Sequence, residues 1–313
     1  QGRTGTGRAW GEKGGPLRGF GLGGRGILSV VDADDASADI FPVGTLLDGR
    51  YEIVRRLGAG GMGVVYEARH VRLGQSVAIK AIRGDVPLTQ AELQRFEREA
   101  RSAAKLRSRH AVRVFDIDTA PNGITYIAME LLRGNDLLAE LAVGPTSGEV
   151  VDWVVQLCDA LQEAHDAGIV HRDIKPENVF IAEDSDRRVA KLLDFGISKV
   201  LSESPSGTTV NSSVMGTPEY MSPEQIRARK VDHRSDIFSL GVLLYRMLAD
   251  RLPFSAGNGF PYLTAVVADP AIPLDSLRPD LPAGLVNVVM TALEKSPDDR
   301  FQSARAMAQA LAP

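Results

Sequence analysis

Three things are scarce in this 313-residue sequence: cysteine, long apolar runs and an excess of positive charge. Cys158 is the single cysteine, so an internal disulfide is excluded and nothing requires an oxidising compartment. No apolar run approaches the ~20 residues that a membrane-spanning helix needs, and ILSVV at 27–31 is followed by acidic residues, unlike a signal peptide. The net charge of -4 disfavours a nucleic-acid surface. We therefore expect a cytoplasmic protein with no membrane span in this chain and no nucleic-acid partner.

What is present is the composition of a globular protein, with 44% apolar and 24% charged residues. The first 26 residues differ, because they are rich in Gly with scattered Arg and have too little apolar surface to offset chain entropy. We expect residues 1–46 to form a Gly-rich, disordered lead and residues 47–312 to form the folded domain. A basic lead that touches a partner is the alternative for the first segment.

The first part of the domain is expected to be rich in β-structure. Alternating or β-branched runs predict strands at 51–58, 64–70, 76–82, 113–119 and 124–131. The first three should form an antiparallel meander, and APNG between the last two is a hairpin signal. Apolar residues at helical spacing predict a helix at 89–106, which Thr89 and Glu92 open as a capping box.

The second part is expected to be mostly helical. A Thr-x-x-Glu cap and the terminal Gly168 bound a helix at 146–168. The run at 235–250 is apolar on nearly all sides, as in an interior helix. The residues that carry chemistry fall in the loops between helices.

A glycine-rich stretch, LGAGGMGVVY, places Gly58, Gly60 and Gly63 in the spacing G-x-G-x-x-G. A dinucleotide-binding fold needs a helix after these glycines, but VVYEA alternates as a strand does, which disfavours NAD. A plain hairpin turn is one alternative. The other is a loop between two strands whose backbone N–H groups approach a triphosphate, since glycine has no Cβ in the way.

Charged residues occur in two apolar settings. Lys80 ends the run VAIK on a predicted strand, where a solvent-exposed lysine is the ordinary alternative. Its apolar neighbours instead favour an anionic partner, either nucleotide phosphates or a carboxylate of the following helix. GIVHRDIKPENVF likewise gathers Asp173, Lys175 and Asn178 between apolar flanks.

Five motifs now occur in order: GAGGMGVV, VAIK, HRDIKPEN, DFG at 194–196, and GTPEYMSPE at 216–224. In order and spacing they resemble the eukaryotic-type protein kinases, and bacterial Ser/Thr kinases of the Hanks type in particular, over about residues 48–311. The resemblance implies an α+β, two-lobed protein kinase fold. It has a small β-rich N-lobe with one main helix at 47–132 and a larger, mostly α-helical C-lobe at 133–312.

The resemblance also implies the catalytic and metal-binding residues. Asp173 would orient the substrate hydroxyl, and Lys175 would face the transferring phosphate. Asn178 and Asp194 would hold Mg²⁺, or alternatively Mn²⁺, through the oxygen ligands that such ions prefer. Thr217 would form hydrogen bonds with Asp173 and Lys175.

The same resemblance implies how ATP is bound. Lys80 would hold the α and β phosphates while paired with Glu99 of the following helix, with Glu97 as the alternative. Met129 would close the back of the adenine pocket, and Glu130 and Leu132 would present backbone groups to the base. Ala78 and Phe180 would lie above and below the adenine, and Asp136 near the ribose. The nucleotide contacts implied are Leu57, Gly58, Gly60, Gly63, Val65, Ala78, Lys80, Glu99, Met129, Glu130, Leu132, Asp136 and Phe180.

The stretch after DFG is rich in hydroxyls, which a flexible polar loop would explain. The resemblance suggests an activation segment at 197–217, autophosphorylated at Thr208 or Thr209. Arg172 and Lys199 would receive the phosphate and order the segment.

Structural roles are implied as well. Glu224 should pair with Arg300 in a buried ion pair, and loss of one partner would strand a charge at a cost of ~3–5 kcal/mol. Asp236 should brace the backbone of the HRD turn. His171 and Phe195 should pack between the two lobes.

Three functions follow from these residues. The first is an ATP-dependent protein Ser/Thr kinase with a signalling role, which acts on protein substrates and forms a transient homodimer for trans-autophosphorylation. Lys175 favours it, because tyrosine-directed relatives usually lack that lysine. The second is a pseudokinase, against which the intact Lys80, Asp173, Asn178 and Asp194 argue. The third is a small-molecule phosphotransferase, which typically lacks a segment ending in PE.

Overall fold

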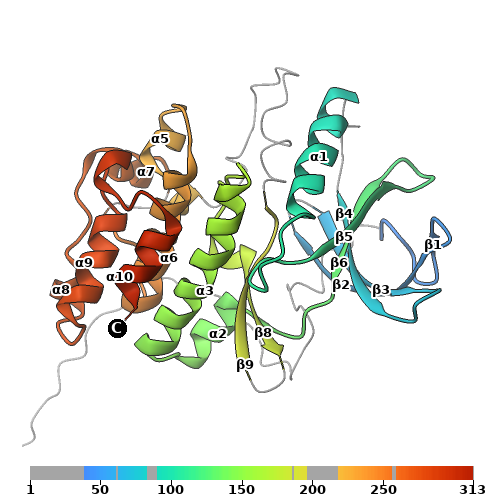
Figure 1. Ribbon diagram of the computed structural model, residues 1–313, viewed down its shortest axis with the longest axis horizontal. Coiled ribbons are helices and arrows are strands. Elements are labelled where there is room, and N and C mark those ends of the chain that lie inside the picture. The colour runs from blue at the N-terminus through green and yellow to red at the C-terminus, as the bar shows by residue number, and fades with distance from the viewer. Residues whose placement is uncertain are drawn as a thin grey trace, which may run out of the picture.

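The computed structural model describes residues 39–60, 63–82, 90–184, 187–195, 218–255 and 259–312. A lobe built on a β-sheet and a larger helical lobe lie side by side, with a small second sheet between them (Figure 1). The expected division into a β-rich N-lobe and a helical C-lobe is confirmed. In the part of the chain that the structure describes, no helix is long and apolar enough to cross a membrane.

The N-lobe sheet has six strands in the order β1-β2-β3-β4-β6-β5, all paired antiparallel. The strands are β1 Leu46–Leu47, β2 Tyr51–Gly60, β3 Gly63–His70, β4 Ser76–Ile82, β5 Val114–Thr119 and β6 Thr125–Glu130. The five predicted strands are therefore confirmed, and β1 is an addition too short to leave a pattern. Alternate residues of a strand, such as Val64 and Tyr66 of β3 or Tyr126 and Ala128 of β6, belong to one buried cluster and form the core on one face of the sheet.

The packed chain begins earlier than the motifs do. Phe41 is 2% exposed, and its ring lies 5.9 Å from the ring of Tyr66 and 6.4 Å from that of Tyr126. The boundary expected at residue 47 thus falls inside a packed segment. Residues 1–38 lie outside the described part of the chain, so the disorder expected of the lead stays a prediction.

Helix α1, Gln90–Ala103, packs against β5 and lies alongside the N-lobe sheet (Figure 1). It begins and ends within a few residues of the predicted helix. The capping box expected at its start involves Thr89, which lies outside the described residues.

A second sheet, in the order β7-β8-β9, lies at the junction of the lobes. Its strands are β7 Gly134–Asp136, β8 Val179–Asp184 and β9 Arg187–Leu192. The sequence patterns did not predict this sheet, because β7 has only three residues and β8 directly follows the loop that carries the catalytic motif.

Helices make up the rest of the C-lobe. They are α2 Leu137–Val143, α3 Ser147–Asp166, α5 Pro223–Ile226, α6 His233–Ala249, α7 Phe260–Ala268, α8 Leu274–Leu277, α9 Ala283–Ala292 and α10 Ala304–Leu311. The 3₁₀ turns are η1 Pro176–Asn178, η2 Pro218–Tyr220 and η3 Pro297–Asp299. The capping box predicted at the start of α3 is present, with Thr146 accepting from the Glu149 N–H and Glu149 accepting in return.

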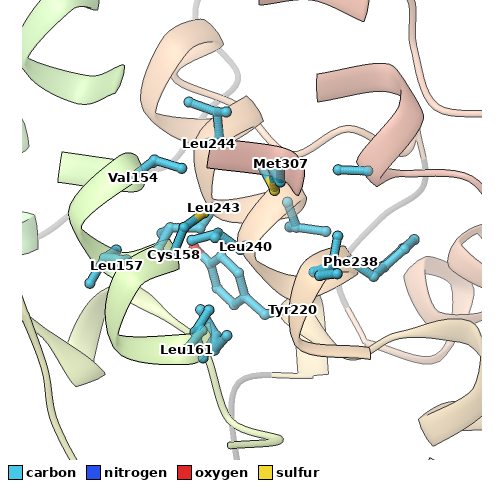
Figure 2. Close-up of a cluster of buried hydrophobic side chains, with 14 of the residues drawn as sticks. Val154, Leu157, Cys158, Leu161, Tyr220, Phe238, Leu240, Leu243, Leu244 and Met307 are labelled. Atoms are coloured by element: carbon cyan, nitrogen blue, oxygen red, sulfur yellow. The ribbon is translucent and has the colours of Figure 1, made fainter. Parts of the chain in front are cut away.

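The C-lobe core lies between α3, α6 and α10. Val154 and Leu161 of α3 face Leu240 and Leu243 of α6, with Met307 of α10 beside them (Figure 2). The interior character predicted for α6 is confirmed by burial around most of its circumference. The loops that carry the site residues are attached to this core.

The predicted ion pair between Glu224 and Arg300 is confirmed. Arg300 donates to both carboxylate oxygens of Glu224, at 2.8 and 2.9 Å, and Ser235 donates to one of them. Burial acts to raise the pKa of Glu224, but the hydrogen bonds from Arg300 and Ser235 outweigh it and hold this pKa below its usual value. The pair ties α5 to the start of α6 and to the segment before α10.

Candidate active site

The β8–β9 hairpin brings Asp194 close to Asn178. Val179 at the start of β8 pairs with Leu192 at the end of β9. One step further along, the Leu193 N–H donates to the Asn178 carbonyl at 2.8 Å. Because Asp194 comes next, antiparallel pairing alone places it beside the loop that carries Asn178.

That loop holds its own polar residues in one network. The Asn178 side-chain amide donates to the Asp173 carbonyl at 2.7 Å and to its carboxylate Oδ2 at 3.0 Å. Lys175 Nζ lies 2.9 Å from the same Oδ2. Asp173 is therefore held at one oxygen by an amide and by an ammonium group.

Lys80 reaches this network from the N-lobe. It lies on β4, is 8% exposed and forms an ion pair with Asp194 Oδ2. Lys80 has an anionic partner, but this partner is Asp194, which is neither of the two expected partners, the nucleotide phosphates and a carboxylate of the following helix. The Glu99 side chain lies outside the described residues, whereas the alternative Glu97 contacts Arg101 at 3.0 Å.

Asp236 braces the turn that precedes the catalytic loop, as predicted. Its carboxylate accepts from the backbone N–H of His171 at 2.9 Å and from that of Arg172 at 2.7 Å. It also contacts His165 Nε2 at 2.8 Å. These bonds hold Arg172 at φ 66°, a left-handed conformation that costs about 1–2 kcal/mol for a residue with a side chain.

Asp194 has the same kind of backbone strain, with φ 56°. The residues around it account for its position. His171 Nε2 lies 2.7 Å from the Leu193 carbonyl, and the His171 ring meets the Phe195 ring edge-on at 5.1 Å. The packing role predicted for this His–Phe pair is confirmed, and it fixes the chain on both sides of Asp194.

Apolar side chains from both lobes meet beside these charges. Ala78 and Met129 face each other across β4 and β6 and belong to one buried cluster. Leu132 and Phe180 belong to another. Leu193 packs against both clusters, so the residues expected above and below the adenine are joined by a residue that the sequence analysis did not name.

The hinge, residues 130–132 between the lobes, has polar contacts within the protein. The Glu130 N–H donates to the Arg113 carbonyl at 2.9 Å, so this N–H is engaged inside the N-lobe. The Glu130 side chain turns to Lys191 at 2.7 Å. Asp136, expected near the ribose, caps α2 by accepting from the Ala139 N–H at 2.8 Å.

The glycine loop joins two strands, as the alternation of VVYEA predicted. Gly58 pairs with Val65, and Gly60 with Gly63, across the β2–β3 hairpin. Leu57 lies on the same hairpin, just before the glycines. The arrangement excludes the strand-to-helix passage of a dinucleotide fold.

Several predicted residues lie outside the described part of the chain. They are Lys199, Thr208, Thr209 and Thr217. The activation segment and its phosphorylation sites therefore remain predictions.

The donor set suits a hard divalent cation. The Asn178 amide nitrogen is engaged with Asp173, which leaves its carbonyl oxygen, and Asp194 uses Oδ2 for Lys80, which leaves Oδ1. Among the described residues, no three His, Cys, Asp or Glu side chains cluster as a metal site. An ion held by Asn178 and Asp194 would complete its shell with water and phosphate oxygens, as Mg²⁺ commonly does.

Gln225 is a further residue that the sequence analysis missed. Its side-chain amide donates to the Arg172 carbonyl at 2.9 Å, while its own oxygen caps α5 at Ser222. The Ser-x-x-Gln capping pattern was visible in the sequence and would have placed the residue at a helix start. Its contact with the catalytic loop depends on tertiary structure.

Comparison with known proteins agrees with this geometry. A family model described as Protein kinase domain matches residues 51–311. The chain is 40% identical over 283 residues to Serine/threonine-protein kinase Pkn1 of Myxococcus xanthus, covering 90% of this chain and 40% of that protein. It is 37% identical over 268 residues to Probable serine/threonine-protein kinase PknB of Corynebacterium glutamicum, covering 83% and 41%.

A solved structure is also similar. The kinase domain of PknI from Mycobacterium tuberculosis superposes with a TM-score of 0.68 at 30% identity, covering 87% of this chain and 98% of that one. The chain spans less than half of the length of the two curated relatives.

Proposed function

Since the chain belongs to the family of protein kinase domains, we propose that it transfers the γ-phosphate of ATP to Ser and Thr hydroxyls of proteins. One observation carries the proposal: Lys80 of the N-lobe contacts Asp194, while Asp173, Lys175 and Asn178 form one network beside it. Phosphoryl transfer depends on alignment and charge compensation rather than on covalent chemistry by the protein. This arrangement supplies both.

Asp173 would position the hydroxyl that is phosphorylated. Its Oδ2 is held by Lys175 and Asn178, so Oδ1 is the oxygen that can accept the hydroxyl proton. The Lys175 ammonium lies close enough to offset negative charge that develops on the transferred phosphoryl group.

Lys80, Asp194 and Asn178 would receive the triphosphate. A bound Mg²⁺ would supply positive charge to the phosphate oxygens, with Asn178 and Asp194 as its protein ligands. Lys80 would hold the α and β phosphates, and Ala78 and Phe180 would enclose the adenine. ATP as the phosphate donor also supports a cytoplasmic location.

The specificity and regulation belong to the same proposal. Lys175 and the GTPEY segment favour Ser and Thr over Tyr. We place autophosphorylation at Thr208 or Thr209, carried out within a transient homodimer, with Arg172 and Lys199 receiving the phosphate. Thr217 would bond to Asp173 and Lys175 in the substrate-bound state.

The transfer activity is tested with radiolabelled ATP, Mg²⁺ and a generic protein acceptor. We expect label in the acceptor and intact-mass additions of whole phosphates on the chain itself, both lost in Asp173→Asn. Equal label in the two proteins would contradict the proposal. Nucleotide binding without any transfer would indicate a pseudokinase, and label only in small alcohols a small-molecule phosphotransferase.

The activation segment is tested separately. Removing both threonines in Thr208→Ala/Thr209→Ala should lower turnover toward a generic acceptor by about tenfold or more, because phosphate-dependent ordering of the segment is lost. Unchanged turnover would remove these two residues from the proposal while leaving the transfer activity intact.

A further inference from the structure

A basic groove lies behind the hinge, away from the catalytic network. Its cavity has a volume of about 730 Å³. Ten residues line the groove, and the charged ones among them are Lys105, Arg107, Arg109, Arg113, Glu130 and Lys191. Five of these ten residues are cations and one is an anion, in a chain whose net charge is -4. Such a local reversal of charge needs an explanation of its own.

Three of the cations form no side-chain ion pair within the part of the chain that the structure describes, although carboxylates accept from the backbone N–H groups of two of them. Arg109 pairs with Asp184 at 2.7 Å, and Lys191 pairs with Glu130 at 2.7 Å. Lys105, Arg107 and Arg113 are exposed, and no carboxylate of the described residues lies within ion-pair distance of their charged groups. A ligand with several negative charges would therefore meet three uncompensated cations around one cavity.

The groove is preformed. The loop between α1 and β5 is held by Glu163, whose carboxylate accepts from the backbone N–H of Arg107 at 2.8 Å and of Ser108 at 2.6 Å. Ser108 also donates to Asp159 at 2.8 Å. A loop that is already held in place loses little conformational entropy when a ligand binds.

The groove is separate from the nucleotide site. Successive residues of a strand point to opposite faces: Met129 packs with Ala78 on the side of the adenine pocket, whereas Glu130 lines the groove. The groove combines the α1–β5 loop with Lys191 of β9, and so touches both lobes. A ligand bound there would lie behind the hinge and contact both lobes.

We propose that this groove binds an acidic peptide segment of a partner protein, one that carries several carboxylates or phosphates. A cavity of about 730 Å³ accommodates a few residues. Carboxylates at its edge, Asp159 and Asp184, disfavour a long polyanion such as a nucleic acid, whose charges continue past the groove. The charge complementarity is local, which suits a short peptide.

Fluorescence anisotropy with labelled peptides tests the proposal. The probes are a short peptide of alternating Glu and Ser, the same peptide with Gln for Glu, and the Gln peptide with phosphoserine. All measurements use Asp173→Asn protein, so that binding is scored without transfer. We expect the Glu or phosphoserine peptide to bind at low ionic strength and more weakly at high salt, and the Gln peptide to bind at least about tenfold more weakly.

Two triple variants locate the binding. Lys105→Glu/Arg107→Glu/Arg113→Glu should weaken binding by about tenfold or more. Arg72→Glu/Lys230→Glu/Arg251→Glu makes the same change of charge at exposed residues outside the groove and should leave binding within about twofold. If the groove variant has a lowered melting temperature, the milder Lys105→Gln/Arg107→Gln/Arg113→Gln replaces it.

The outcomes are separable. Equal loss in both triple variants, or equal binding of the Glu and Gln peptides, would overturn the proposal. Tighter binding of a single-stranded oligonucleotide than of either acidic peptide, lost in the groove variant, would replace it with a nucleic-acid site. Phosphoserine binding without Glu binding would narrow the ligand to phosphopeptides. None of these results depends on transfer activity, so a failed kinase assay would leave this inference standing.

Discussion

At the scale of single residues, two carboxylates only a hairpin apart have different environments. Asp173 is held by Lys175 and Asn178 within one loop. Asp194 has a strained backbone and a cation from the other lobe, Lys80. In the proposed function, the first would meet the hydroxyl, and the second would meet the metal and the phosphates.

Replacing Asp194 tests this distinction. In Asp194→Asn the side chain keeps its size but loses its charge, so Mg²⁺, which would compensate the charge of the phosphates, loses its anionic ligand. We therefore expect transfer to fall by about 10²-fold or more. The rate and its Mg²⁺ dependence are the measurements. Asp275→Asn, an exposed position on α8, is the matched control and should leave both unchanged. A variant as active as the parent would contradict the assignment.

A second residue-scale prediction concerns Lys295 in the C-lobe. Its Nζ lies 3.6 Å from the centroid of the Phe254 ring and donates to the Val266 carbonyl at 2.7 Å. Burial lowers the pKa of this ammonium from 10.5 to about 8. Between these values the unfolded chain holds a proton that the folded chain has released, so stability rises with pH over this window.

Urea unfolding at several pH values from about 8 to just below 10 measures this rise as a difference between two proteins, before tyrosines ionise. The difference is needed because burial raises the pKa of the Cys158 thiol from 9.0 to about 12, which lowers the stability of both proteins as the pH increases. The stability of the parent relative to Lys295→Met should rise with pH, and Lys230→Met, at an exposed position, should behave as the parent does. The same slope in Lys295→Met and in the parent would show that another group is responsible.

At the scale of elements, the short helix α5 helps to position the catalytic loop. Helix α5 is a single turn, capped by Ser222 and Gln225. It contacts the catalytic loop through Gln225 and the C-lobe frame through the Glu224–Arg300 pair. Contacts with α5 therefore hold the catalytic loop, although a helix of a single turn would not be stable by itself.

Close packing of α6 against α9 depends on a missing side chain. A Cβ on Gly241 would lie 2.8 Å from the Ala292 Cβ. Gly241→Ala should therefore destabilise the fold by about 1–3 kcal/mol, despite the higher helix propensity of alanine. Adding Ala292→Gly should restore part of the loss. Gly284→Ala on α9 is the control. A Cβ added at Gly284 would have no atom of another part of the chain within 4 Å, so this change should be neutral or stabilising.

Chemical denaturation of the four proteins measures these effects. Loss of stability in Gly284→Ala equal to that in Gly241→Ala would indicate a general cost of alanine in these helices, rather than the close approach of α6 and α9.

At the scale of the whole molecule, polar contacts join the lobes both at the nucleotide site and behind the hinge. Lys80 pairs with Asp194 at the nucleotide site, where His171 and Phe195 also pack. Behind the hinge, Arg109 pairs with Asp184 and Lys191 pairs with Glu130. A nucleotide bound beside Lys80 and Asp194 would contact both lobes. Its binding should therefore stabilise the molecule as a unit.

Thermal unfolding with ATP and Mg²⁺ tests this coupling. At a ligand concentration about a hundredfold above Kd, mass action adds ~2.7 kcal/mol, which corresponds to a rise in Tm of about 5–10 °C for a domain of this size. Lys80→Met should lose most of the rise. An equal rise in this variant would mean that ATP does not contact Lys80.

Much of the fold and site could be predicted because the relevant signals are local. The Thr146–Glu149 cap, the strand alternation at β2 to β4 and the apolar α6 each depend on residues close in the chain. The short sheet β7-β8-β9 could not be predicted, because strands of three to six residues beside a polar loop have no distinctive period.

The amino-acid order alone determined which chemical groups are available, such as Lys80, Asp173 and Asn178, and the type of the main elements that carry them. Tertiary structure decided which groups meet: Lys80 with Asp194, Gln225 with the Arg172 carbonyl, and the cations behind the hinge with one another. The physical reason is that periodicity and capping act over a few residues, whereas these contacts depend on how separate elements pack.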